Sequence, residues 1–141
     1  MKYLFVTNIP SPYRVNFFNA LSKFVDAKNK IFSDYEQDQV NFLFNIETKL
    51  GFDNLSSMND FANKSRNISG IVFGRVDFCG SLGLSRDDIN SEQILNYCKS
   101  SSNFCKDNGI DFVVGGGISS LSIDFLSDVS KIHLSRFETR K

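Results

Sequence analysis

Short apolar segments alternate with helix-like segments from residue 40 onward, and this alternation restricts the possible folds more than any other feature. The apolar segments are residues 40–46, 70–73, 111–114 and 131–134. Between them, apolar side chains recur every three or four positions, as on one face of a helix. Buried strands separated by amphipathic helices predict a parallel sheet covered by helices, and therefore an α/β fold.

The clearest helix pattern spans residues 90–108. Asn90 is its expected N-cap, and Gly109 follows its end, where a left-handed backbone favours glycine. We expect one face of this helix to be buried, because its apolar and thiol side chains share that face. These side chains are Ile94, Cys98 and Cys105.

The remaining patterns are shorter. A helix is expected at residues 121–129, with Ser119 or Ser120 as its cap, and another is indicated by Leu55, Met58, Phe61 and Ala62. Near the N-terminus, a strand at residues 3–6 leads into a loop that holds both prolines, and a helical pattern begins at Val15. The chain therefore has a short N-terminal strand–loop–helix segment before the regular alternation.

Length, charge and cysteine content exclude several classes of protein. With 141 residues, the chain is shorter than a complete (β/α)₈ barrel of about 200–250 residues. Its net charge of zero argues against nucleic acid or an anionic membrane as a partner, and no apolar run is long enough to span a bilayer. The chain has three cysteines without a CxxC pair and a single histidine, and this set of side chains argues against a zinc site. Free thiols and a cytoplasmic location are expected.

Two acidic residues follow neighbouring strands at the end where parallel α/β proteins place their functional groups. Glu47 comes directly after the segment at 40–46, and Asp77 follows the segment at 70–73 after three residues. Neighbouring strands lie about 4.8 Å apart, so the two carboxylates can converge at one edge of the sheet. Two carboxylates and water suit Mg²⁺ or Mn²⁺. The alternative is that either acid caps a helix or pairs with an arginine.

Two further features at strand ends are open to two interpretations each. The run at residues 115–117 is three glycines, which could offer backbone N–H groups to an anion or could simply make a tight turn. His133 lies within the last apolar segment. That position favours a core or barrel-wall histidine over a catalytic base.

Paired motifs carry a resemblance to a known family. One motif is Asn45-Ile46-Glu47-Thr48, the other is the segment from Ser69 through Gly74-Arg75-Val76-Asp77, and the similarity continues through residues 113–118 to the C-terminus. Over residues 23–141 the chain resembles the HpcH/HpaI aldolase and citrate lyase family. Within that family it is similar to a branch found among bacterial surface-sugar genes.

The resemblance implies part of a TIM barrel that breaks or forms C–C bonds next to a pyruvate or acyl-CoA enolate held on Mg²⁺ or a similar ion. Carried over to this chain, Glu47 and Asp77 match the metal-binding acids. Gly74, Val76 and Asp77 match the loop whose backbone amides hold the substrate carboxylate. A divalent ion chelated by a 2-oxo acid would stabilise the charge that develops during cleavage.

Two positions depart from the family pattern. Asn45 stands where the family often has glutamine, and Arg75 stands where it often has proline. Asn45 is kept as a substrate-binding candidate with a side chain one methylene shorter. Arg75 either contacts an anionic substrate or points outward and pairs with an acid.

The first 22 residues resemble something else. The run from Leu4 through Pro10-Ser11-Pro12 to Val15 looks like the opening strand, loop and helix of a family-4 glycosyltransferase. The glutamate pair that such enzymes use is absent. We therefore divide the chain into a glycosyltransferase-like segment at 1–22 and a partial TIM-barrel domain at 23–141.

The sequence predicts a divalent-metal-dependent carbon–carbon lyase, in the form of the C-terminal half of a barrel. Its expected partner is a small 2-oxo acid or acyl-CoA, and it is expected to self-associate or to pair with a separate half-barrel. No residue is assigned to proton transfer, because the family's arginine and histidine come from the first half of the barrel. The chain alone is therefore not expected to cleave an aldol. The alternatives are a glycosyltransferase fragment and a non-catalytic remnant.

Overall fold

The structure, a computed structural model, describes residues 2–6, 40–57 and 69–139. The helical pattern predicted from Val15 lies outside these residues. Of the helix indicated around residues 55–62, only the first turn at 55–57 is described, and it is helical.

Within these described residues, five parallel strands form one sheet in the order β1-β2-β3-β4-β5. Three of the four strands predicted from residue 40 onward are confirmed as neighbours in this sheet, and the fourth lies further along the chain than predicted. The N-terminal strand, also predicted, pairs with β2 in parallel, with Leu4 opposite Phe42. The strands are β1 (Lys2–Val6), β2 (Val40–Ile46), β3 (Gly70–Gly74), β4 (Asp111–Gly115) and β5 (Arg136–Phe137).

The last strand begins later than the apolar pattern predicted. The segment 131–134 forms a turn and an irregular connection, and strand pairing begins only at Arg136. Leu134 packs against the core from this connection, which is why the segment is apolar without being a strand. The backbone N–H groups of Ser135 and Glu138 donate to the carbonyls of Phe112 and Val114, so the pairing is centred about four residues beyond the predicted segment.

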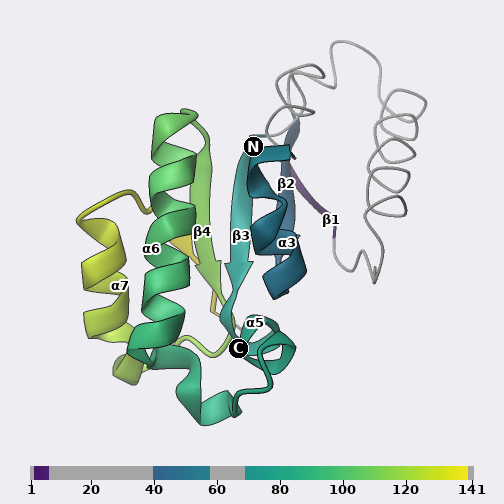
Figure 1. The fold of residues 1–141 in the computed structure, drawn as a ribbon. Coiled ribbons are helices and arrows are strands. Elements are labelled where there is room, and N and C mark those ends of the chain that lie inside the picture. Colours follow the sequence, from purple (N-terminus) through teal and green to yellow (C-terminus); the bar gives the residue numbers. More distant parts are fainter. Residues whose placement is uncertain (1, 7–39, 58–68, 140–141) are drawn as a thin grey trace.

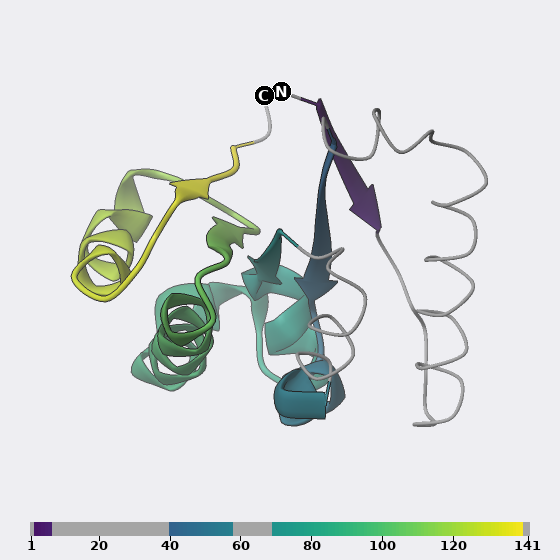
Figure 2. The ribbon, with the colours of Figure 1, turned by 90° about the horizontal axis from the view of Figure 1, so that it is seen from above.

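The sheet is curved, and α6 and α7 lie on its outer side (Figures 1 and 2). The main helices are α3 (Lys49–Asp53), α5 (Arg75–Ser81), α6 (Glu92–Asp107) and α7 (Ile123–Ser130), with short 3₁₀ helices η1 (Arg86–Asn90) and η2 (Ser120–Ser122). This order of parallel strands and outer helices is the predicted partial (β/α) barrel.

Two helix starts differ in detail from the prediction. Ser91, not Asn90, caps α6 by accepting from the N–H of Ile94, because η1 occupies the residues up to Asn90. Ser119 is confirmed as a cap, but of η2, and α7 begins after it. Gly109 has the left-handed conformation predicted for the end of α6, with φ of 63°.

The core lies mainly between the sheet and the helices. The outward-facing strand residues pack against α5, α6 and α7, and the thiols of Cys79, Cys98 and Cys105 are free and buried among them, as expected. A second, smaller cluster of Leu43, Val72 and Val113 lies on the opposite face of the sheet. Within the described residues, no helix is long and apolar enough to cross a membrane.

Candidate functional site

The strand register places four residues in one row at the carboxyl ends of β2 to β5. Gly74 pairs with Gly115, and the neighbouring pairs extend this row to Glu47 on one side and Glu138 on the other. Side chains alternate along a strand, so this row lies on the same face as the inner cluster of Leu43, Val72 and Val113. We call these four residues the carboxyl rim.

Glu47 lies directly against Gly74. A Cβ atom built on Gly74 would lie 2.8 Å from Cγ of Glu47 and 3.3 Å from its Oε1. Any side chain at position 74 would therefore displace the glutamate. The glycine leaves room for the carboxylate of Glu47 beside the start of α5.

Asn45 orients this carboxylate. Its Nδ2 donates to Oε1 of Glu47 over 2.8 Å. Its own Oδ1 is buried and accepts no hydrogen bond in the described part of the chain. A buried acceptor without a donor is costly, and a water or a bound ligand with a free donor would remove that cost.

Asp77 lies in the first turn of α5, where its side chain is exposed. Gly74 is the N-cap of this helix and provides no side-chain cap. Glu47 therefore lies against Gly74 from the neighbouring strand, and Asp77 follows Gly74 in the first turn of α5. Among the described residues, neither acid takes part in an ion pair.

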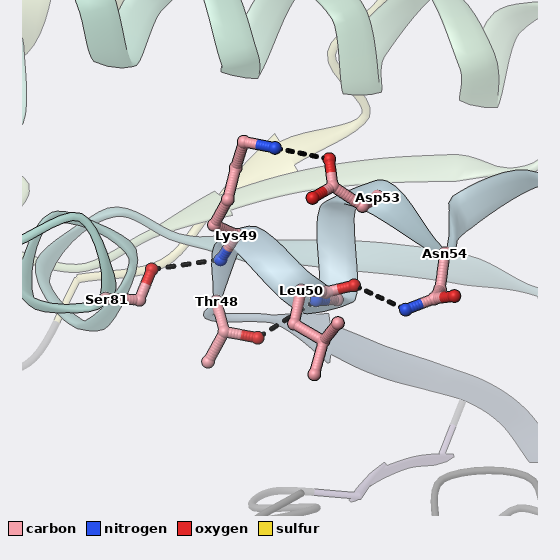
Figure 3. Close-up of polar contacts among 7 residues, drawn as sticks. Thr48, Lys49, Leu50, Asp53, Asn54 and Ser81 are labelled. Carbon is pink, nitrogen blue, oxygen red and sulfur yellow. Dashed lines mark hydrogen bonds and ion pairs between the residues drawn. The ribbon is translucent and has the colours of Figure 1, made fainter. Parts of the chain in front are cut away.

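The helix that follows Glu47, α3, is connected to α5 by a hydrogen bond (Figure 3). The backbone N–H of Lys49 donates to Oγ of Ser81 over 2.9 Å, and Ser81 in turn donates to the carbonyl of Phe78. Thr48 begins α3 by accepting from the N–H of Gly51. These bonds hold the segment around Glu47 against the helix that carries Asp77.

Arg75 does not point outward, which corrects one of its two predicted interpretations. Its side chain is fully buried, and its guanidinium donates to Gly115 O, Gly116 O, Oδ1 of Asn90 and Oγ of Ser122. The guanidinium carbon also lies 4.8 Å from the centre of the Phe125 ring. Its prediction as a residue that contacts an anionic substrate stays a prediction.

The glycine run forms a tight turn. Gly116 and Gly117 have φ of 82° and 67°, in the left-handed region. A Cβ atom on Gly116 would lie 2.8 Å from the backbone nitrogen of Val76 and 3.0 Å from that of Arg75. Only glycine therefore lets the turn lie against the start of α5, and two of its carbonyls are directed to the guanidinium of Arg75.

His133 lies at the opposite end of the sheet. It sits in the connection before β5, not in a strand as predicted, and its Nε2 lies 2.9 Å from the carbonyl of Ile110. Ile110 precedes β4, so the histidine is at the amino end of that strand. The predicted core or barrel-wall histidine is thus a half-buried residue of a connection, at the end of the sheet away from Glu47.

Sequence reasoning missed the partners of Arg75. The position of Asn90 before an apolar pattern is typical of a helix cap, and Ser122 lies within an ordinary helical pattern. No local signal identifies either as an arginine partner, because the contacts join residues 15 and 47 positions from Arg75.

Several solved proteins have the same fold over most of this chain. RipC from Yersinia pestis superposes with a TM-score of 0.64 at 16% identity, covering 96% of this chain and 56% of RipC. An HpcH/HpaI aldolase/citrate lyase family protein from Burkholderia cenocepacia J2315 gives 0.54 at 14%, covering 94% and 45%. Macrophomate synthase gives 0.53 at 18%, covering 76% and 38%.

These comparisons show the fold. The chain spans about half the length of RipC and of the aldolase family protein, and less of macrophomate synthase. No family model and no curated protein matches the sequence. The solved neighbours give no support to the glycosyltransferase alternative, and most of the segment that suggested it lies outside the described residues.

Proposed function

We propose that this chain is part of a divalent-metal-dependent carbon–carbon lyase, related to the HpcH/HpaI aldolase and citrate lyase family. Its substrate class is a pyruvate-type 2-oxo acid or an acyl-CoA. The fold shared with three solved proteins, one of them from that family, supports this proposal. The observation that carries it is the position of Glu47 against Gly74, the N-cap of the helix that bears Asp77.

The residues present fit Mg²⁺ or Mn²⁺. Among the described residues, no three His, Cys, Asp or Glu side chains gather to hold a metal. Glu47 and Asp77 would be the protein ligands of the proposed site, and water and substrate oxygens would complete the shell, as is usual for Mg²⁺. The buried Oδ1 of Asn45, which lacks a donor, fits a metal-bound water next to Glu47.

The chain's own groups would position the substrate around such an ion. When bound, the ion would supply a Lewis acid that stabilises negative charge on the 2-oxo acid. Asn45 holds Glu47 in a fixed orientation through its amide. The backbone at Gly74, Val76 and Asp77 would receive the substrate carboxylate, and Asn45 stays a candidate for contact with the substrate. The group that moves the proton stays unassigned.

Titration calorimetry with Mn²⁺, with and without pyruvate, tests the proposal. We expect Glu47→Gln and Asp77→Asn each to weaken Mn²⁺ binding at least tenfold, because each removes one of two charged ligands. Glu92→Gln and Asp87→Asn are matched controls, because both side chains are exposed and start other helices. Equal binding by the wild type and the double variant would reject the site.

A further inference from the structure

The burial of the charged Arg75 side chain lowers the stability of the fold. A buried charge destabilises a protein unless an opposite charge compensates it. Every group that accepts from Arg75 is uncharged, and no ion pair of the described residues includes it. Burial alone is the main influence on its pKa, which it lowers. The free-energy cost of burying Arg75 is accounted for if its contacts serve another purpose in the fold.

The contacts of Arg75 join segments that are distant in the sequence. Its Nη1 donates to Asn90 over 2.6 Å, at the end of η1. Its Nη2 donates to the carbonyl of Gly116 over 2.9 Å and to Ser122 over 3.2 Å. One side chain from the first turn of α5 therefore connects the loops that follow β3 and β4.

These contacts also set the position of the glycine turn. The turn passes close to the backbone nitrogens of Arg75 and Val76, where no side chain at position 116 would fit. A planar guanidinium can bind two carbonyls and two side-chain oxygens at fixed angles, which an ammonium cannot do. The turn is thus held against the helix start by bonds that require the shape of arginine.

We propose that Arg75 is the positioning residue of the carboxyl rim, acting as a clasp that holds the turn at residues 115–117 against the first turn of α5. The clasp fixes the helix start that carries Asp77 relative to Glu47. It acts through the loops and does not touch the substrate. The expected effect of Arg75 on ligand binding rests on the proposed function. Its expected effect on the turn at residues 115–117 is independent of that function.

Two variants test whether the hydrogen bonds of Arg75 or only its positive charge are required. Arg75→Met keeps an unbranched, flexible side chain but loses all donors, and Arg75→Lys keeps the charge but loses the planar guanidinium. We expect the methionine variant to bind Mn²⁺ with pyruvate 10- to 100-fold more weakly, as is usual when a group that orients metal ligands is removed. The lysine variant should resemble it. Arg86→Met, which removes an exposed arginine from η1, should bind like the wild type.

Hydrogen–deuterium exchange measures the clasp without any ligand. In both Arg75 variants, peptides covering residues 113–122 should exchange several-fold faster, and peptides within α6 should exchange at the wild-type rate. Unchanged exchange at 113–122 would overturn the clasp. So would full binding by the lysine variant, because charge alone would then suffice. If the wild type binds no Mn²⁺ and no pyruvate, the proposed function fails, and exchange alone decides the clasp.

Discussion

The two ends of the sheet differ in whether their charged side chains form ion pairs. At the amino end, Asp111 accepts from Ser135 over 2.9 Å and from Arg136 over 3.3 Å, and His133 lies against the carbonyl of Ile110. At the carboxyl rim, Glu47 accepts from the uncharged amide of Asn45. No ion pair of the described residues includes Glu47, Asp77 or Arg75.

Under the proposed function, this difference corresponds to a structural end and a candidate functional end. Paired charges satisfy one another and need nothing from outside the chain. Acids left near each other without a cation repel, and they gain from a proton or a bound cation. In (β/α) barrels the amino end commonly serves stability, and the carboxyl end carries the reaction. The charges of this chain follow the same division.

Two glycines on the same strand give the largest expected contrast between the ends. A Cβ on Gly70 would lie 2.6 Å from the backbone oxygen of Asp111, which cannot move without breaking the pairing of β3 and β4. We expect Gly70→Ala to lower the free energy of unfolding by about 3 kcal/mol, at the upper end for overpacking. Urea unfolding followed by circular dichroism measures this loss.

Gly74→Ala should behave differently, because the nearest atoms belong to the side chain of Glu47. That side chain can rotate away, so we expect a stability loss under about 1 kcal/mol. Rotation of Glu47 should instead weaken Mn²⁺ binding at least tenfold. If Gly74→Ala destabilised the protein as much as Gly70→Ala and left binding intact, the division between the ends would be wrong.

Much of this fold can be predicted from the sequence, because its elements depend on local patterns. The strand at 40–46 is wholly apolar except for its asparagines, and α6 ends at a glycine with positive φ. The prediction failed at the last strand, where Leu134 is apolar because it packs on the core from a connection. Composition cannot distinguish a buried connection from a buried strand.

The acidic residues of the site could also be found, because parallel strands bring their carboxyl ends together. Glu47 and Asp77 follow β2 and β3 as predicted, although their roles as ligands stay predictions. Arg75 could not be interpreted correctly from sequence, since its partners come from loops far along the chain. The place of Glu138 in the rim depends on the register of β5, which the apolar pattern misplaced.

The buried thiols offer a smaller test of the same contrast. Cys79 lies in α5 beside the rim, and Cys105 lies near the end of α6, close to the amino ends of the strands. Functional ends of folds open more readily than structural ends. We therefore expect Cys79 to react first with an aromatic disulfide reagent at pH 8, and all three thiols to react after denaturation without reductant. Earlier reaction of Cys105 would contradict the division.

The same thiols predict how stability depends on pH. Burial raises the pKa of Cys105 to about 12, and it also raises the pKa values of Cys98 and Cys79, from an ordinary value near 9.0. Above pH 9 the unfolded chain therefore loses thiol protons that the folded chain keeps. Stability should fall as the pH rises, by about 1 kcal/mol for each deeply buried thiol at pH 10. Replacing Cys105 with alanine should reduce this slope.

The smallest expected effect belongs to the ion pair at the amino end. Asp111 and Arg136 have side chains 41% and 28% exposed, so water screens much of their attraction. Asp111→Asn keeps one acceptor for Ser135 and removes the charge, and we expect a loss below about 1 kcal/mol that shrinks further in 1 M salt. Mn²⁺ binding should stay at the wild-type level, because the pair lies at the other end of the strands. Glu47→Gln should give the opposite result, with binding weakened and stability kept, since a glutamine oxygen can still accept from Asn45. Urea unfolding and calorimetry on both variants measure the two quantities side by side. If Asp111→Asn weakened Mn²⁺ binding as strongly as Glu47→Gln, charges at the amino end would act on the rim, and the two ends could not be treated as separate.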